Sequence, residues 1–246
     1  MLTSRILIQG IPAVVCGEPS ERVFLFVHGQ SGCKEEAIDF ANVVQPKGWQ
    51  VVGVDLPEHG ERKNETGRFY PWVAVPELQM VFRYLEQSGY GRIALRANSI
   101  GAWFCMLAFQ NRRIEESLLV SPILNMAHLI EKMMGWAGVS IEELEARQTI
   151  ETGFGQPLSW EYYSYAIQHP IDAWDSPTSL LYGSNENLTD RTDIDAFAKR
   201  FRCDLSVMEN GEHWFHTEEQ LAVLNDWVAE RVQHSLFQLT IVRRDG

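Results

Sequence analysis

The chain has 246 residues, of which 45% are hydrophobic and 22% are charged, a composition that is ordinary for a folded domain and excludes a disordered chain. Asp and Glu outnumber Lys and Arg by 33 to 21, which gives a formal net charge of −12. A nucleic-acid groove needs concentrated positive charge, so we expect no nucleic-acid partner. Because α/β folds of about 250 residues often form one unit, we expect a single domain over 1–246.

Membrane insertion and secretion are also disfavoured by the sequence. The longest strictly apolar run, Ala102–Phe109, is far shorter than the roughly 18 residues that a membrane-spanning helix needs. The first ten residues lack the basic start and apolar stretch of a secretory signal. The cysteines lie far apart, without CxxC spacing, so we expect a cytoplasmic protein with free thiols, no disulfide framework, no metal site and no cofactor. The four cysteines are Cys16, Cys33, Cys105 and Cys203.

The first half of the chain alternates short apolar runs with amphipathic segments. Val23–Val27 has no polar alternation, which is typical of a strand buried on both faces. Leu78, Val81, Phe82 and Leu85 recur at helical spacing. The pattern predicts a hairpin over 6–16, strands over 23–27, 50–54 and 92–95, and helices over 33–44, 72–87 and 99–110.

The same alternation returns near the end of the chain, with strands expected over 117–120, 178–182 and 204–208 and a helix over 193–200. Thr217 and Gln220 form a capping box that predicts the start of a last helix. The order of elements predicts an α/β fold with a mostly parallel central sheet and helices on both faces. Ligands of such sheets bind beyond the carboxyl ends of the strands.

The segment 122–176 interrupts this alternation of strands and helices. It has two helical patches, one of them capped by Ser140 with Glu143, and it is rich in aromatic residues and methionine. We therefore expect it to be a short helical insertion that covers the sheet as a lid.

The segment Ala97-Asn98-Ser99-Ile100-Gly101 lies between a predicted strand and an apolar helix. A sharp strand-to-helix turn needs small residues around its serine, which is the physical basis of the G-x-S-x-G pattern, and here Ala97 replaces the first glycine. The turn would place the Ser99 hydroxyl at a helix N-terminus, where developing negative charge is stabilised. The alternative is that Ser99 only caps the helix.

With its context, this segment resembles the α/β-hydrolase family over nearly the whole chain, and most of all its compact serine esterase and lipase-like members with a small helical lid. Each of four further matching motifs follows a predicted strand, and the motifs occur in the family order of nucleophile, acid and histidine. These motifs are His28-Gly29-Gln30, Asp55-Leu56-Pro57-Glu58-His59-Gly60, Tyr182-Gly183-Ser184-Asn185-Glu186 and Gly211-Glu212-His213-Trp214.

The resemblance implies that Ser99 is a nucleophile and His213 its general base, ahead of the neighbouring His216. Glu186 stands where the family usually has aspartate, and Asp190 is the alternative acid. By the same resemblance, the backbone amides of Gln30 and Ile100 form an oxyanion hole. We expect His28 and His59 to be structural. The residues expected to contact substrate are Gly29, Trp136, Trp160 and Trp214.

Three functions remain open from the sequence. The first is hydrolysis of a neutral, apolar or aromatic carboxylic ester, a small molecule held under the aromatic lid. The second is a peptidase or amidase of the same fold, and the third is a non-catalytic member that binds a hydrophobic ligand. The apolar run Leu236–Val242 predicts a terminal strand, which would pair at a sheet edge within the chain or in a homodimer.

Overall fold

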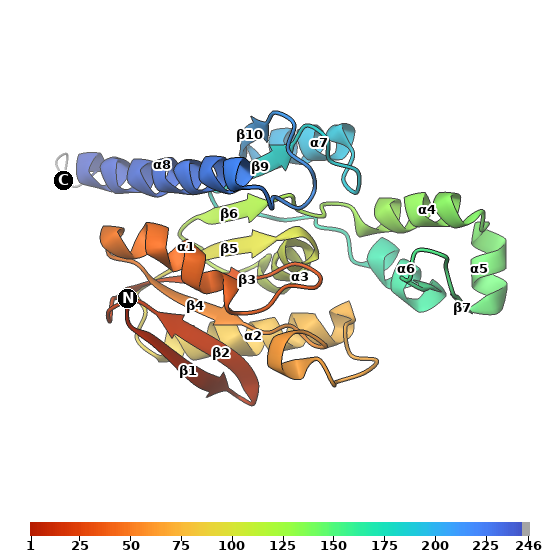
Figure 1. The fold of residues 1–246 in the computed structure, drawn as a ribbon, viewed down its shortest axis with the longest axis horizontal. Coiled ribbons are helices and arrows are strands. Elements are labelled where there is room, and N and C mark those ends of the chain that lie inside the picture. The colour runs from red at the N-terminus through yellow and green to blue at the C-terminus, as the bar shows by residue number, and fades with distance from the viewer. Residues whose placement is uncertain (243–246) are drawn as a thin grey trace.

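The structure is a computed structural model that describes the backbone of residues 1–242 and the side chains of residues 1–232. A central sheet contains eight strands in the order β1-β2-β4-β3-β5-β6-β9-β10 (Figure 1). Its strands are β1 (Thr3–Ile8), β2 (Ile11–Cys16), β3 (Arg22–Val27), β4 (Gln50–Val54), β5 (Arg92–Asn98), β6 (Ser117–Val120), β9 (Thr178–Gly183) and β10 (Asp204–Met208).

The sheet is mostly parallel, as the sequence predicts. The opening hairpin pairs β1 with β2 in antiparallel fashion, and β2 is antiparallel to β4. All pairings from β4 through β10 are parallel. The carboxyl ends of these parallel strands therefore meet at one edge of the sheet, where the loops after β3, β5, β9 and β10 come together.

Each face of the sheet has its own hydrophobic core. Successive residues of β3 point to opposite faces: Val23, Leu25 and Val27 enter one core, whereas Phe24 and Phe26 enter the other. Helices α2, α3 and α7 pack on the first face, and α1 and α8 pack on the second. Their bounds are α1 (Glu36–Val44), α2 (Pro71–Gln87), α3 (Ser99–Phe109), α7 (Arg191–Phe201) and α8 (Glu218–Val242), with short 3₁₀ turns at η1 (Gln45–Lys47) and η2 (Gly60–Arg62).

The segment 122–176 forms a helical group beyond one end of the sheet (Figure 1). Where the sequence predicts two helical patches, the structure has three helices and a two-stranded ribbon. As expected, the Ser140 side chain caps a helix by accepting a hydrogen bond from Glu143 N–H. The elements are α4 (Met126–Ala137), α5 (Ile141–Arg147), β7 (Thr149–Ile150), β8 (Leu158–Ser159) and α6 (Trp160–Gln168).

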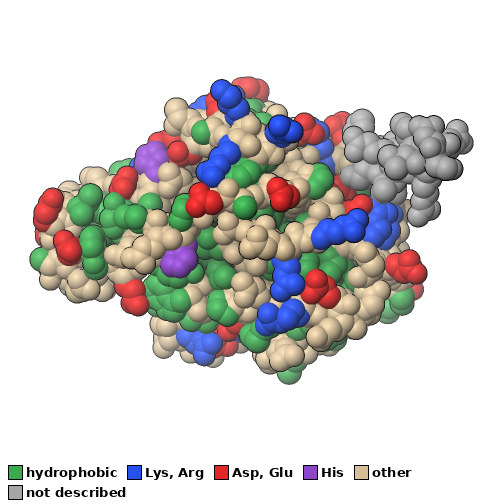
Figure 2. All heavy atoms as spheres, turned by 180° about the vertical axis from the view of Figure 1, so that it is seen from behind, with side chains coloured by type: hydrophobic (Ala, Val, Ile, Leu, Met, Phe, Trp, Pro, Cys, Tyr) green, Lys and Arg blue, Asp and Glu red, His purple; other side chains and the backbone are tan. Residues whose placement is uncertain are grey.

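Hydrophobic side chains gather on the outer surface of this helical group, at the end of the molecule away from α8 (Figure 2). The large apolar residues of the segment that are exposed are Trp136, Ile141, Phe154 and Ile167. Across the described residues, no helix is long and apolar enough to cross a membrane.

The prediction of a terminal strand over Leu236–Val242 is wrong, because α8 continues as one helix to Val242. The helix begins at the predicted capping box: Gln220 N–H donates to Thr217 Oγ1, and Thr217 N–H donates to the Gln220 side chain. A helix that has begun extends residue by residue, and this overrides the β-propensity of its last residues. The homodimer prediction thereby loses the edge strand on which it depended.

Candidate active site

Ser99 lies at a sharp turn between β5 and α3. Its φ angle is 49°, in the left-handed region that few non-glycine residues adopt, as the strained elbow requires. The departure at Ala97 is accommodated because Ala97 lies in β5 and its φ angle is not positive, so the position does not require glycine. Gly101, by contrast, cannot carry a side chain, since an added Cβ would lie 2.1 Å from the carbonyl oxygen of His28.

The structure brings Ser99, His213 and Glu186 together. Ser99 Oγ is 2.7 Å from His213 Nε2, and His213 Nδ1 is 2.8 Å from both carboxylate oxygens of Glu186. A carboxylate can only accept, so the proton of the neutral imidazole resides on Nδ1 and is donated to Glu186. Nε2 is then an acceptor, and the Ser99 hydroxyl donates to it. This is the polarity that a serine nucleophile and its base require.

The carboxylate of Glu186 is buried and held by backbone amides. Its side chain has 0% exposure, and Oε1 accepts hydrogen bonds from the N–H groups of Asn187, Leu188 and Thr189 at 3.0, 2.8 and 3.4 Å. These bonds fix the direction of the carboxylate.

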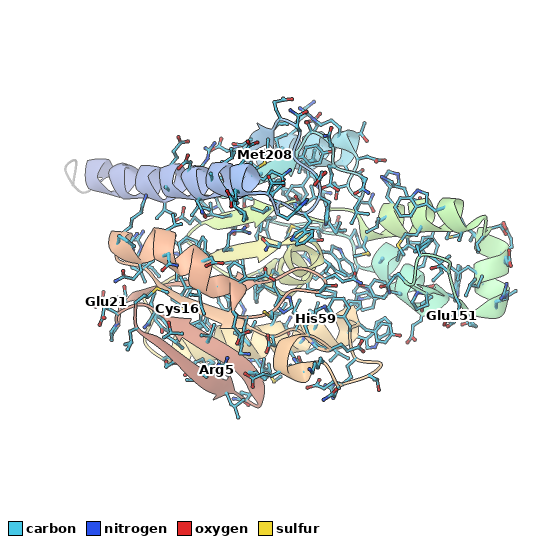
Figure 3. All side chains as sticks on the ribbon, viewed as in Figure 1. Arg5, Cys16, Glu21, His59, Glu151 and Met208 are labelled. Atoms are coloured by element: carbon cyan, nitrogen blue, oxygen red, sulfur yellow. The ribbon has the colours of Figure 1, made fainter. Side chains whose placement is uncertain are left out.

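The loops that carry Glu186 and His213 lie directly against each other. Ser184 N–H donates to the carbonyl of Met208 (2.9 Å), and Asn185 N–H donates to the carbonyl of Gly211 (2.8 Å). Met208 ends β10 and is labelled in Figure 3. Gly183 permits this approach, because a Cβ there would lie 2.3 Å from Gly211 O. Gly183, the last residue of β9, thus has a steric function.

His216 and Asp190, the alternative base and acid left open by the sequence, make other contacts. His216 is exposed, stacks on Trp214 with ring centroids 4.7 Å apart, and places Nδ1 at 2.9 Å from the Trp214 carbonyl. Asp190 pairs with Lys132 and lies 3.5 Å from the ring of His128 on helix α4. The geometry at Ser99 therefore involves His213 and Glu186 rather than the alternatives that the sequence left open.

The turn after β3 is held by His28. Its Nε2 accepts from Leu56 N–H (3.1 Å) and its Nδ1 lies 2.7 Å from Gly29 O, so the ring is neutral with the proton on Nδ1. Burial of the fully covered ring lowers the pKa of His28 to about 4. His59, labelled in Figure 3, lies beside it, with ring centroids 5.2 Å apart, and its Nδ1 lies 2.7 Å from Pro57 O. Both histidines thus support the loop, and the hydrogen bond of the Ser99 hydroxyl is made with His213 instead.

The two amides expected to form an oxyanion hole belong to the residue after Gly29, which lies against Ser99, and to the residue after Ser99 itself. A Cβ built on Gly29 would be 3.1 Å from Ser99 Cβ, so the turn that ends at Gln30 runs past the serine. Ile100 is the second residue of α3, and the first four N–H groups of a helix have no acceptor within it. An anion beside Ser99 would also lie at the positive end of that helix.

Arg96, a buried charged residue close in sequence to the turn at Ser99, was not predicted from the sequence to have a role. Arg96 in β5 is 3% exposed; its guanidinium donates to the Asn98 side chain and to Ala97 O. The Asn98 amide in turn contacts Glu36, whose carboxylate accepts from Cys33 N–H (3.1 Å). Burial lowers the pKa of Arg96 to about 9, against the opposing effect of Glu36. The one signal in the sequence is an arginine directly after the strand predicted over 92–95.

The residues expected to contact substrate are spread over the site and the helical group. Gly29 adjoins Ser99, and Trp214 follows His213 but is 73% exposed. Trp136 is 53% exposed and meets Phe154 edge-on. Trp160 lines a cavity of about 500 Å³ that includes neither Ser99 nor His213. The other residues that line this cavity are Trp72, Gln148, Glu161, Ser164, Tyr165 and Gln168.

The helical group also contacts the site directly. Gln30 Nε2 donates to Gln156 Oε1 at 3.0 Å, which joins the loop beside Ser99 to the segment before β8. On α3, Trp103 stacks on Tyr162 of α6, with ring centroids 6.0 Å apart. Most of the aromatic residues of the segment therefore pack it against the core.

The four cysteines are free thiols, and burial raises the pKa of Cys105 well above its ordinary value. Among the side chains that the structure describes, those of residues 1–232, no group of three His, Cys, Asp or Glu is arranged to hold a metal ion.

The strand order and the strained serine elbow define an α/β-hydrolase fold, and solved structures with the same fold extend over nearly the whole chain. Est1E from Butyrivibrio proteoclasticus, solved with ferulic acid bound, has a TM-score of 0.75 at 18% identity, over 95% of this chain and 99% of that one. The Pyrococcus furiosus esterase PF2001 has a TM-score of 0.66 at 15% identity, over 96% and 90%.

Mouse alpha/beta hydrolase domain-containing protein 10 is similar to the same extent, with a TM-score of 0.73 at 13% identity over 95% of this chain and 99% of the mouse chain. At these identities the comparison establishes the fold. No protein-family model and no curated protein sequence matches the chain.

Proposed function

We propose that this protein is a serine hydrolase that cleaves a neutral carboxylic ester with an apolar or aromatic acyl part. The observation that carries the proposal is the continuous hydrogen-bonded series from Ser99 Oγ through His213 to Glu186, at 2.7 and 2.8 Å. Est1E, whose fold is the same, was solved with ferulic acid, an aromatic carboxylic acid, and this supports an aromatic acyl group here.

In the proposed reaction, His213 Nε2 takes the proton of Ser99 as Oγ attacks the ester carbonyl carbon. The backbone N–H groups of Gln30 and Ile100 stabilise the oxyanion of the tetrahedral intermediate. The intermediate collapses to an acyl-enzyme on Ser99, and the leaving alcohol receives its proton from His213. Water, deprotonated by the same imidazole, then releases the carboxylic acid and restores the hydroxyl of Ser99.

Glu186 has a supporting role in each step. Its carboxylate keeps the His213 proton on Nδ1 and stabilises the imidazolium that forms twice per turnover. The segment 122–176 serves as the lid of a single domain, with Gln156 in contact with Gln30 at the edge of the site. Trp214, Trp136 and Trp160 are proposed to contact the apolar part of the substrate, together with the backbone at Gly29.

A fluorophosphonate probe tests the nucleophile, because it labels a serine only when a base activates it. The wild type is expected to be labelled, and Ser99→Ala is expected to remain folded, unlabelled and slower on p-nitrophenyl esters by about 10⁴-fold or more. Ester hydrolysis that persists in folded Ser99→Ala would overturn the assignment.

The class of substrate needs a second comparison. Parallel assays with p-nitrophenyl esters and aminoacyl anilides separate an esterase from an amidase of the same fold, and we expect turnover of the esters. An intact wild type that the probe fails to label would favour a protein that only binds a hydrophobic ligand.

A further inference from the structure

Lys132 links the helical lid to the loop that holds the proposed catalytic acid. It lies on α4, and its side chain is only 21% exposed. Its ammonium donates to the carbonyl oxygens of Asn187 and Leu188 at 3.1 and 3.4 Å and pairs with the carboxylate of Asp190. One lid cation is thus bound at three points to the four residues that follow Glu186.

The two carbonyl groups belong to the same peptide units that bind Glu186. The peptide 187–188 offers its carbonyl to Lys132 and its N–H, on Leu188, to Glu186 Oε1 at 2.8 Å. The peptide 188–189 does the same, through Leu188 O and Thr189 N–H. Lys132 therefore binds the negative ends of two dipoles whose positive ends bind the carboxylate of Glu186.

This arrangement strengthens the hold on Glu186 in two ways. An ammonium on the carbonyl oxygen polarises a peptide and makes its N–H a better donor, because hydrogen bonds in series reinforce each other. The ammonium also balances Asp190, which would otherwise place an unpaired negative charge beside a loop that already surrounds a buried carboxylate. Lys132, together with His128 at 3.5 Å, lowers the pKa of Asp190.

We infer that Lys132 is a positioning residue, which aims the Glu186 carboxylate at His213 through the peptides 187–188 and 188–189. The inference rests on the proposed function, because it assigns Lys132 a part in orienting the base of that reaction. It also gives Asp190 a role: instead of contacting His213, Asp190 anchors the lysine that orients Glu186.

The test removes the ammonium but keeps the length of the side chain. We expect Lys132→Met to lower kcat on a p-nitrophenyl ester by about tenfold, with KM nearly unchanged, since the loss falls on the transition state. Lys132→Arg, which keeps the charge and the donors, should recover most of the rate. Lys199→Met, at an exposed lysine of the neighbouring helix α7, is the matched control and should behave as the wild type.

A readout that does not require turnover is the far-downfield proton resonance of His213 Nδ1–H, which reports its hydrogen bond to Glu186. We expect it to shift or broaden in Lys132→Met and to remain in place in Lys199→Met, with circular dichroism confirming that both variants are folded. An unmoved resonance in folded Lys132→Met would overturn the inference, as would a loss confined to KM, which would indicate a lid contact alone. Failure of the proposed function would appear separately, as a wild type that neither reacts with fluorophosphonate nor hydrolyses any ester.

Discussion

The carbonyl oxygen of His28 lies so close to the Cα of Gly101 that a single methyl group would stand 2.1 Å from it. This contact joins the turn after β3 to the first turn of α3. The two amides of the proposed oxyanion hole, at Gln30 and Ile100, come one from each side of it. Their separation is therefore set by backbone packing against a residue that has no side chain.

Gly101→Ala is accordingly expected to separate the two amides and to lower kcat/KM by about 10²-fold, because a misplacement of about 1 Å at a reacting group has an effect of this size. We expect it also to reduce the free energy of unfolding by about 1–3 kcal/mol, as overpacking does. The matched control is Gly135→Ala in helix α4, where an added Cβ meets no atom within 4 Å. Equal activity of the two variants would contradict the argument.

The base can be identified by the pH dependence of kcat/KM. Acidification is expected to abolish activity, because an imidazolium cannot accept the proton of Ser99. His213→Gln should remove both the activity and this dependence, whereas His216→Gln should change kcat/KM little, since His216 contacts Trp214 and not Ser99. The reverse pattern in a pH–rate series would move the role to His216.

The acid is tested by Glu186→Gln. The three amide donors on Oε1 will bind the carbonyl oxygen of the new side chain, which leaves its NH₂ group facing His213 and forces the proton onto Nε2. We expect kcat to fall by about 10⁴-fold, because Nε2 can then no longer accept the Ser99 proton. Single-turnover measurement of acylation on a p-nitrophenyl ester checks the step directly.

Two further variants at this loop act as controls. Glu186→Asp keeps a carboxylate and should retain more activity than Glu186→Gln, with a shortfall of up to about 10²-fold from the shorter side chain. Asp190→Asn should lower kcat by less than about tenfold, because Asp190 is 42% exposed and pairs with Lys132 rather than His213. A crippled Asp190→Asn beside an active Glu186→Gln would transfer the role of acid to Asp190.

The buried ring of His28 makes stability depend on pH. Its pKa is about 4 in the folded protein and about 6.5 in the unfolded chain, so between these values the unfolded state binds the proton and the folded state does not. The free energy of unfolding should therefore fall as the pH drops from 6.5 to 4, by about 3 kcal/mol from this residue. Urea unfolding of wild type and His28→Gln over this range gives the contribution as the difference in slope. Parallel curves would refute it.

The sequence alone determined the order of the chemistry along the chain. Ser99, Glu186 and His213 each follow a run of residues whose periodicity predicts a strand, and parallel strands bring such loops to one edge of a sheet. The type of each residue is also a local property, as are the small residues around Ser99. For these reasons the fold could be predicted before any contact was known, whereas the roles of Ser99 and His213 were implied by the resemblance to the α/β-hydrolase family and the acid was left open between Glu186 and Asp190.

Only the tertiary structure decided which groups touch. Ser99 and His213 are 114 positions apart, and the choice of Glu186 over Asp190 depends on how two loops pack, which periodicity does not encode. The contacts of Lys132 and Arg96 could not be predicted from the sequence, because the partners of a lysine on a helix or of an arginine in a strand are set only when the chain is folded. The prediction of a terminal strand was wrong because local β-propensity is a weak preference, and the last residues instead extend the helix α8 that precedes them.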